Sequence, residues 1–432
     1  MKIFMVIIIL MELFLCTALA DTDDCSKFKD YTNTSSTIKN VLNEMNVIAL
    51  TEPDYAKVIS LPETTDPVMP GGIPETIKAI LVSKGAGAVF GNTTGKPAVI
   101  ITGAIHANEW IGAEVALSIA KHLVTHATNN APLFGSKRMN IESLLENIEV
   151  IVIPVLNPAG YRYSRNEHNR AAGCIACSPY DIDTDLNAYY EVVSDESGTV
   201  ERVIGYDWYF EHPKPRYADS RKSRRDVSNA PNGPGGLGLA FGVDLNRNFP
   251  DFWDYPTDAG SNDPRDYGNY RGSGAGSEKE TMALKSLYDI QSRKVKAHID
   301  FHASRTLKII AYPWAHTTDV IDGGNNNLRP DSNTKDKDLF PAMANKMTAG
   351  TVGYSIGQNQ GFTAGGTVRD WAYNSYSTAA FNFEVTTSLE EFQPKWQLIA
   401  PICEENRLGA LWLMFWAADQ GFRNKPKLHL GN

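Results

Sequence analysis

The sequence predicts an α/β fold, because strand-like and helix-like patterns alternate along the chain. Residues 98–105 form an almost unbroken apolar run that is rich in β-branched side chains, as expected of a strand buried on both faces. Residues 110–124 follow after a short turn and carry apolar side chains at helical spacing. Two more runs, at 148–155 and 295–302, have the pattern of strands. This order predicts an open sheet in which ligands bind at the carboxyl ends of the strands.

Two candidate metal ligands flank the turn between the first of these strands and its helix. His106 follows the strand and Glu109 opens the helix. Hydrolytic zinc sites take three protein ligands from His and carboxylate side chains and leave a fourth position for water. The His-x-x-Glu spacing alone is a weak signal, since a Glu at a helix start also suits the helix dipole. Its position after a buried strand favours a metal site.

A third ligand has three candidates, His298, His302 and His316. Strand alternation places His298 and His302 on the same face as Asp300, with Val295, Ala297, Ile299 and Phe301 on the other. His302 stands at the carboxyl end of its strand, where the ligand crevice is expected, so His302 is the predicted ligand. His298 is predicted to be a partly buried histidine whose hydrogen bonds are satisfied.

Four segments together resemble the zinc metallocarboxypeptidases of the carboxypeptidase A/B family. The segments are His106-Ala-Asn-Glu109, Gly242-Val-Asp-Leu-Asn-Arg-Asn248, Asp300-Phe-His302 and Phe381-Asn-Phe-Glu384. The resemblance implies a three-layer α/β/α fold with a mixed, mostly parallel sheet. It also implies one Zn2+ per chain, held by His106, Glu109 and His302, and hydrolysis of the C-terminal bond of peptides or proteins.

The resemblance further implies how a substrate would be held. Asn246 and Arg247 match the residues that bind the terminal carboxylate, and a planar guanidinium beside an amide suits that anion. Asp244 matches the residue that hydrogen-bonds a ligand histidine, here His106.

Two more residues match the family's catalytic groups. Glu384 ends the strand 378–383 and matches the general base, which takes a proton from water and passes it to the leaving amine. A salt bridge is the alternative role for a carboxylate at this place. Arg221 matches the group that stabilises the oxyanion, with Arg224 as a supporting cation. The alternative for this basic run is a solvated face.

Two positions depart from the family pattern. Phe362 stands where the family usually has a tyrosine on a mobile cap, so Tyr354 or Tyr373 would have to supply that hydroxyl, or none does. Asn108 replaces an arginine between the first two ligands, which weakens any expectation about contacts to substrate residues further from the cut.

A third departure concerns the residue that sets the terminal side-chain preference in the family, which is Arg369 here. A fixed cation in that pocket predicts a preference for terminal Asp or Glu. The alternative is that Arg369 pairs internally with Asp370 or Glu390 and leaves an apolar pocket.

The composition is that of a large globular chain, and its first residues have the pattern of a secretory signal. With 432 residues, 42% hydrophobic, 21% charged and a net charge of −9, the chain has enough apolar residues for a large core and no basic stripe for nucleic acid. Residues 1–20 have the charged start, apolar core and A-x-A end of a secretory signal. We therefore expect a secreted monomer, or one in a lysosomal or vacuolar lumen, with no membrane contact after signal removal.

The predicted organisation has four parts. After the signal, residues 21–74 form a polar, helix-poor N-terminal segment, and residues 75–420 form the catalytic domain, which starts with a strand at 77–82. An insertion at about 165–215 could rim the active-site funnel or be a plain surface excursion. Residues 421–432 form a tail. We expect neither a folded inhibitory pro-domain nor an appended carboxy-terminal β domain.

Four cysteines remain once Cys16 leaves with the signal, and they allow three pairings. We expect Cys174 to pair with Cys177 and Cys25 with Cys403. The sequons at Asn33 and Asn92 also suit secretion.

Two other functions stay open. One is a related zinc acyl-amino-acid hydrolase, against which the chain length and the wall at 369–371 argue. The other is a catalytically silent binding protein on the same fold, against which the complete set of ligands, Glu384 and Arg221 argue, although Phe362 gives it some support.

Overall fold

The structure is a computed structural model, and it describes the core of the chain with gaps. The described residues are 29, 31, 40–67, 73–89, 92–134, 139–165, 190–195, 198–203, 221–224, 242–264, 266, 268–304, 306–316, 334–348, 351, 353–358, 361–387, 392–394 and 396–422. The predictions for the signal 1–20, for Asn33, and for Cys25, Cys174, Cys177 and Glu390 lie outside them, as does most of the tail.

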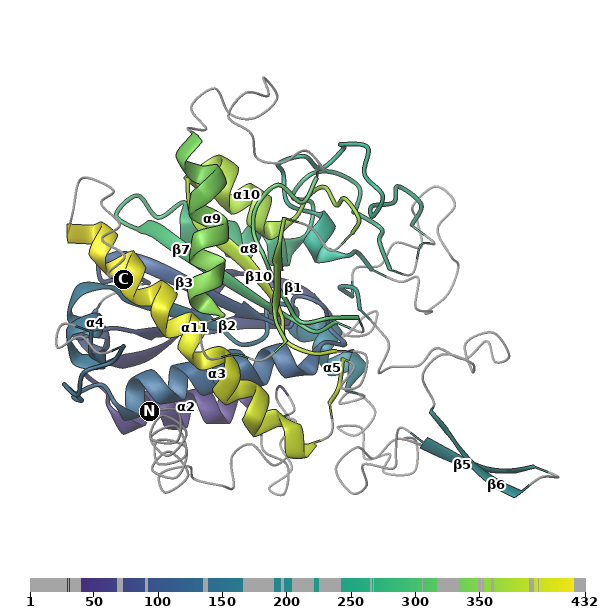
Figure 1. Cartoon of the computed structure of the whole chain (residues 1–432), viewed down its shortest axis with the longest axis horizontal. Coiled ribbons are helices and arrows are strands. Elements are labelled where there is room, and N and C mark those ends of the chain that lie inside the picture. Colours follow the sequence, from purple (N-terminus) through teal and green to yellow (C-terminus); the bar gives the residue numbers. More distant parts are fainter. Residues whose placement is uncertain are drawn as a thin grey trace, which may run out of the picture.

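An eight-stranded mixed sheet runs through the middle of the domain (Figure 1). Its spatial order is β1 (Ala56–Pro67), β2 (Pro74–Val82), β4 (Glu149–Ile153), β3 (Pro97–Gly103), β7 (Lys294–His302), β10 (Ala379–Glu384), β8 (Ile309–Ala311) and β9 (Ser355–Gly357). The four central strands β4, β3, β7 and β10 are parallel to one another. Antiparallel pairs flank them, at β1–β2, β2–β4 and β10–β8. The prediction of a mixed, mostly parallel sheet is confirmed.

Helices cover both faces of this sheet and make the domain three-layered. One face packs against α2 (Val41–Thr51), α3 (Trp110–Thr125), α4 (Ile141–Asn147), α9 (Thr334–Met347) and α11 (Trp396–Phe422). The other face packs against α8 (Lys279–Tyr288) and α10 (Val368–Tyr376). Strand β3 is buried from Ala98 to Gly103, since both helical layers cover it. Burial on both faces explains its unbroken apolar sequence.

Strand β7 departs from the predicted alternation at one end. Ala297, Ile299 and Phe301 pack toward the α3 side, whereas Val295 packs toward the α8 side. The pairing of β7 with β3 shifts by one residue after Val295. An extra residue of this kind turns the preceding side chain to the other face. The prediction that Val295 shares a face with Ala297 is therefore wrong, while His298, Asp300 and His302 keep a common face.

The N-terminal segment is also more regular than predicted. It contains α2, which begins after Asn40, whose side chain accepts a hydrogen bond from the Asn43 N–H at 2.7 Å. It also contains β1, which forms the outer strand beside β2. The prediction of a helix-poor segment is therefore wrong for residues 41–51, because burial of Val41, Met45 and Ile48 against the core stabilises a helix of modest amphipathicity.

The remaining elements are short. They are η1 (Ala86–Ala88), α5 (Pro158–Ser164), η5 (Leu245–Arg247) and a separate hairpin of β5 (Tyr190–Asp195) and β6 (Gly198–Val203) inside the predicted insertion. A role of the insertion at the rim of the site stays a prediction. Among the described helices, none combines the length and apolarity that a membrane span requires.

Candidate active site

The three predicted ligands meet where two neighbouring parallel strands end. His106 follows β3, Glu109 immediately precedes the first residue of α3, and His302 is the last residue of β7. Because β3 and β7 are hydrogen-bonded side by side, their carboxyl ends bring these side chains together. The turn between strand and helix is sharp, with Ala104 at a φ of 45°, a conformation that costs energy for a residue with a Cβ atom.

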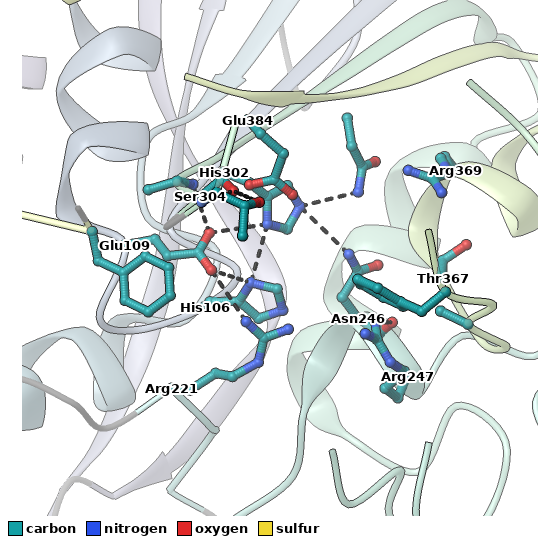
Figure 2. Close-up of a pocket in the computed structure, with 16 residues that line it drawn as sticks. His106, Glu109, Arg221, Asn246, Arg247, His302, Ser304, Thr367, Arg369 and Glu384 are labelled. Carbon is teal, nitrogen blue, oxygen red and sulfur yellow. Dashed lines mark hydrogen bonds and ion pairs between the residues drawn. The ribbon is translucent and has the colours of Figure 1, made fainter. Parts of the chain in front are cut away.

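The ligand atoms are close enough to share one metal ion (Figure 2). Nδ1 of His106 lies 2.8 Å from Glu109 Oε1, and Nδ1 of His302 lies 3.0 Å from Glu109 Oε2. The two Nδ1 atoms are 3.0 Å apart. A tetrahedral zinc ion with bonds of about 2.0–2.1 Å places its ligand atoms roughly 3.3 Å from one another. The donor set and its spacing therefore fit zinc, and within the described residues this is the only such group of His, Cys, Asp and Glu.

The neighbouring imidazoles favour the ionised form of Glu109. Burial alone would raise the pKa of Glu109, but the interactions with His106 and His302 lower that pKa below its ordinary range. An ionised carboxylate is the form that binds a metal ion.

Each ligand histidine has a carboxylate on its other ring nitrogen. Nε2 of His106 lies 3.2 Å from Asp244 Oδ1, as the family resemblance implied. Nε2 of His302 lies 2.7 Å from Asp300 Oδ2. The contact of Asp300 was missed at the sequence level, although strand alternation had already placed Asp300 on the same face as His302.

Arg221 lies beside the ligands. Its Nε donates to Asp244 Oδ2 at 3.0 Å and its Nη1 to Glu109 Oε1 at 3.2 Å. The backbone N–H of Ala107 donates to the Arg221 carbonyl, which holds this segment against the ligand turn. Arg224, by contrast, is buried with its guanidinium 3.7 Å from the ring centroid of Tyr163 and is not part of the pocket lining.

The ligands open into a pocket that gathers the other predicted site residues. Its lining includes Arg221, Asn246, Arg247, Phe362, Arg369 and Glu384. Figure 2 shows Asn246, Arg247 and Arg369 on one side of His106 and His302, and Glu109 on the other side of these two histidines. Asp244 is fully buried behind the histidine that it contacts.

Asn246 presents a hydrogen-bond donor to this pocket. The N–H of Val368 donates to Asn246 Oδ1 at 2.9 Å, which fixes the amide oxygen on the protein side. Its Nδ2 consequently lies toward His302 and the pocket. Beside it, Arg247 donates to the Asn246 carbonyl, while its buried Nε makes no hydrogen bond within the described structure. The pair offers N–H groups to an anion.

Arg369 is buried in the first turn of α10. Its Nη2 donates to the Gln358 carbonyl at 2.9 Å, and its Nε lies 4.0 Å from Asp370 Oδ1. Asp370 is already occupied, since it accepts from the backbone N–H groups of residues 314–316 and lies 2.9 Å from His316 Nδ1. The internal pair with Asp370 is thus at best weak, and Glu390 lies outside the described part.

The two histidines that were not favoured as ligands have other surroundings. Nε2 of His298 lies 3.0 Å from Thr102 Oγ1, and burial lowers the pKa of His298 to about 4. His298 is therefore a satisfied buried histidine, as predicted. His316 contacts Asp370 and stacks on Phe252 with a centroid distance of 3.6 Å.

Phe362 and the two tyrosines considered in its place have different surroundings. Phe362 lines the pocket and is 39% exposed, and no tyrosine is found among the described lining residues. Tyr354 donates instead to Asn406, and Tyr373 is buried against Trp314. Asn108 is buried outside the lining.

Comparison with known proteins identifies the family. A family model described as "Zinc carboxypeptidase" matches residues 73–409, so the chain belongs to the zinc carboxypeptidase family. Its similar relatives include zinc carboxypeptidase A 1 of Drosophila melanogaster, 26% identical over 340 residues, which are 76% of this chain and 59% of that protein. Zinc carboxypeptidase A 1 of Anopheles gambiae is 24% identical over 311 residues, 72% of this chain and 52% of the relative. The chain thus spans little more than half the length of these relatives.

Solved structures support the fold. Bovine thrombin-activatable fibrinolysis inhibitor, in complex with tick carboxypeptidase inhibitor, has a TM-score of 0.57 at 18% identity, over 88% of this chain and 96% of that chain. Carboxypeptidase A from Helicoverpa armigera also has a TM-score of 0.57 at 18% identity, over 88% of this chain and 72% of that chain. At this identity the likeness concerns the fold.

Proposed function

We propose that this protein is a secreted zinc metallocarboxypeptidase that removes the last residue from peptides or proteins. The observation that carries the proposal is the convergence of the His106, Glu109 and His302 ligand atoms with Glu384 and three arginines on one pocket. The family match over residues 73–409 supports the same activity. The pattern of residues 1–20 supports secretion, and we expect a monomer.

The metal site would hold one zinc ion on His106, Glu109 and His302. When bound, zinc would lower the pKa of a water molecule and polarise the substrate carbonyl. Asp244 and Asp300 orient the two imidazoles by accepting hydrogen bonds at Nε2, which leaves each Nδ1 for the metal.

The substrate's free carboxylate would bind to Asn246 and Arg247. The amide donor of Asn246 and the guanidinium of Arg247 both face the pocket, and a charged fork next to an amide forms strong hydrogen bonds to a carboxylate. Holding the last residue in this way places its peptide bond next to the ligands, which favours cleavage at that bond alone.

The two remaining groups, Glu384 and Arg221, would transfer a proton and stabilise negative charge. Glu384 would hold the proton taken from water at its carboxylate and pass it to the leaving amine. Arg221, 22% exposed at its side chain, keeps a face toward the pocket and would stabilise the oxyanion.

The first test is release of amino acids from a peptide panel. We expect release of only the last residue from peptides with a free carboxyl terminus, loss of release with a zinc chelator, and recovery with added Zn2+. A C-terminal amide removes the anion that Asn246 and Arg247 bind, so amidated peptides should be poor substrates. Turnover of N-acylated amino acids without peptide cleavage would contradict the proposal, as would internal cleavage or an inactive protein that binds zinc.

We expect the terminal preference to be acidic because of Arg369. Its guanidinium lines the pocket, and its Nε lies 4.0 Å from Asp370, whose oxygens accept other hydrogen bonds, so a terminal Asp or Glu would pair with it and a terminal Lys or Arg would be repelled. Truncating one partner of such a buried pair costs about 2–5 kcal/mol, so Arg369→Ala should lower kcat/KM for Glu-ending peptides by at least about 30-fold.

The measurement compares kcat/KM on otherwise identical peptides ending in Glu, Phe and Lys. Lys308→Ala is the matched control, since that cation pairs with Glu405 outside the pocket lining and should leave the preference unchanged. A preference for Phe that Arg369→Ala leaves unaltered would show that the cation does not meet the substrate.

A further inference from the structure

A row of buried hydrogen-bonding side chains extends from His302 into the interior. His302 Nε2 contacts Asp300 Oδ2 at 2.7 Å, and Asp300 Oδ1 accepts from Thr102 Oγ1 at 2.6 Å. Thr102 Oγ1 lies 3.0 Å from His298 Nε2, and His298 Nδ1 lies 2.8 Å from the Tyr288 hydroxyl. All five side chains are buried. Strands β3 and β7 and helix α8 supply them, and the proposed reaction uses only His302 directly.

The direction of every hydrogen bond in this row follows from one carboxylate. The Thr102 hydroxyl donates to Asp300 Oδ1, and the other carboxylate oxygen, Oδ2, faces His302 Nε2. A carboxylate accepts hydrogen bonds at both oxygens, so the single Thr102 proton points to Asp300. Thr102 Oγ1 must then accept from His298, which therefore carries its proton on Nε2. A neutral imidazole has one donor and one acceptor, so His298 Nδ1 accepts from Tyr288.

At the other end of the row, the same carboxylate fixes His302. Three polar groups approach His302 Nε2, but Asn246 and Asn382 do so through their Nδ2 atoms, at 3.4 and 3.2 Å. Asp300 is the nearest and approaches through an acceptor oxygen. Nε2 therefore donates to Asp300, and the lone pair of Nδ1 points toward His106 and Glu109.

We propose that Tyr288, His298, Thr102 and Asp300 form a positioning chain that sets the tautomer and ring orientation of His302 for metal binding. The inference rests on the proposed metal site and not on the proposed reaction. This positioning chain differs from the groups that support His106. Asp244 accepts a hydrogen bond from the cation Arg221, whereas Asp300 accepts one from the neutral hydroxyl of Thr102.

The test is Asp300→Asn, which keeps the shape but reverses the polarity. In the zinc-loaded protein His302 carries its proton on Nε2, so the amide oxygen must face His302 and the amide nitrogen must donate to Thr102. Thr102 then turns its proton to His298 Nε2, and His298 must carry its own proton on Nδ1. We expect this switch of the His298 tautomer in 15N NMR spectra of histidine-labelled protein, and metal affinity about 10–100-fold lower in chelator competition.

Asp244→Asn is the matched control, because it makes the same change on the other ligand histidine. It should weaken metal binding without altering the His298 tautomer. If Asp300→Asn does not fold, Thr102→Val removes the hydroxyl link and Thr102→Ser restores it, so metal affinity should fall in the first and recover in the second. The proposal is overturned if His298 keeps its proton on Nε2 in Asp300→Asn, or if metal affinity stays within about threefold in Asp300→Asn or Thr102→Val.

These outcomes are independent of the peptidase assay. An unsubstituted protein that binds zinc and cleaves no peptide would contradict the proposed function and leave the positioning chain intact. An enzyme that cleaves peptides, but whose His298 tautomer does not change in Asp300→Asn, would contradict the positioning chain and leave the proposed function intact.

Discussion

Replacing Glu384 by glutamine is expected to lower kcat by about two to four orders of magnitude, the usual contribution of a positioned general base. Glu384 ends β10 directly beside His302 in the parallel register, so its side chain shares the pocket with the proposed ligands. Glutamine keeps the size and hydrogen-bonding reach of the side chain but cannot take up a proton. Metal content and peptide affinity should therefore stay close to those of the unsubstituted protein.

The measurement combines steady-state kinetics with metal analysis of the same preparation. Glu405→Gln is a matched control, since Glu405 pairs with Lys308 outside the pocket lining and should not affect turnover. Phe362→Tyr provides a second comparison, because restoring a hydroxyl at the cap should change the rate far less than the loss of Glu384. Near-normal turnover in Glu384→Gln would remove this residue from the mechanism.

The central sheet could be predicted because its strands have an unambiguous pattern. Strand β3 is buried on both faces, and α3 follows with helical periodicity. The ligand positions at the ends of β3 and β7 follow from the same reasoning, since adjacent parallel strands end at one edge. Local sequence was sufficient here because burial, and not a distant contact, decides the pattern.

Other features depend on contacts that the local sequence does not encode. The bulge that turns Val295 away from Ala297 arises from the pairing with β3. Helix α2 is stabilised by packing against α3, which the polar composition of its segment conceals. The family resemblance gave a role to Asp244 but none to Asp300, whose burial and whose contacts with His302 and Thr102 are visible only in the structure.

The proposed role of Arg369 lies between these cases. The position of Arg369 in the sequence indicated a contact with the substrate, but whether Asp370 pairs with it internally could be assessed only from the structure. Asp370 accepts hydrogen bonds from three backbone N–H groups and contacts His316, so it has little capacity left for a guanidinium. This arrangement supports an arginine that is available to a substrate.

Replacing His302 by alanine is expected to abolish both zinc binding and turnover. His302 is one of the three proposed ligands, and its Nδ1 lies 3.0 Å from atoms of both His106 and Glu109. With two protein ligands left, a zinc site of this class is incomplete. The change also leaves Asp300 and Glu109 buried without the imidazole between them, which should lower the free energy of unfolding.

Metal analysis and thermal unfolding with and without Zn2+ separate these effects. A ligand that binds only the folded state raises its stability, so added zinc should raise the Tm of the unsubstituted protein and leave that of His302→Ala unchanged. His126→Ala is a matched control, because His126 lies at the end of α3 outside the ligand group and should retain the zinc-dependent rise. Stoichiometric zinc in folded His302→Ala would overturn the ligand assignment and direct attention to His298. That outcome is disfavoured by the structure, since both ring nitrogens of His298 are occupied by Thr102 and Tyr288.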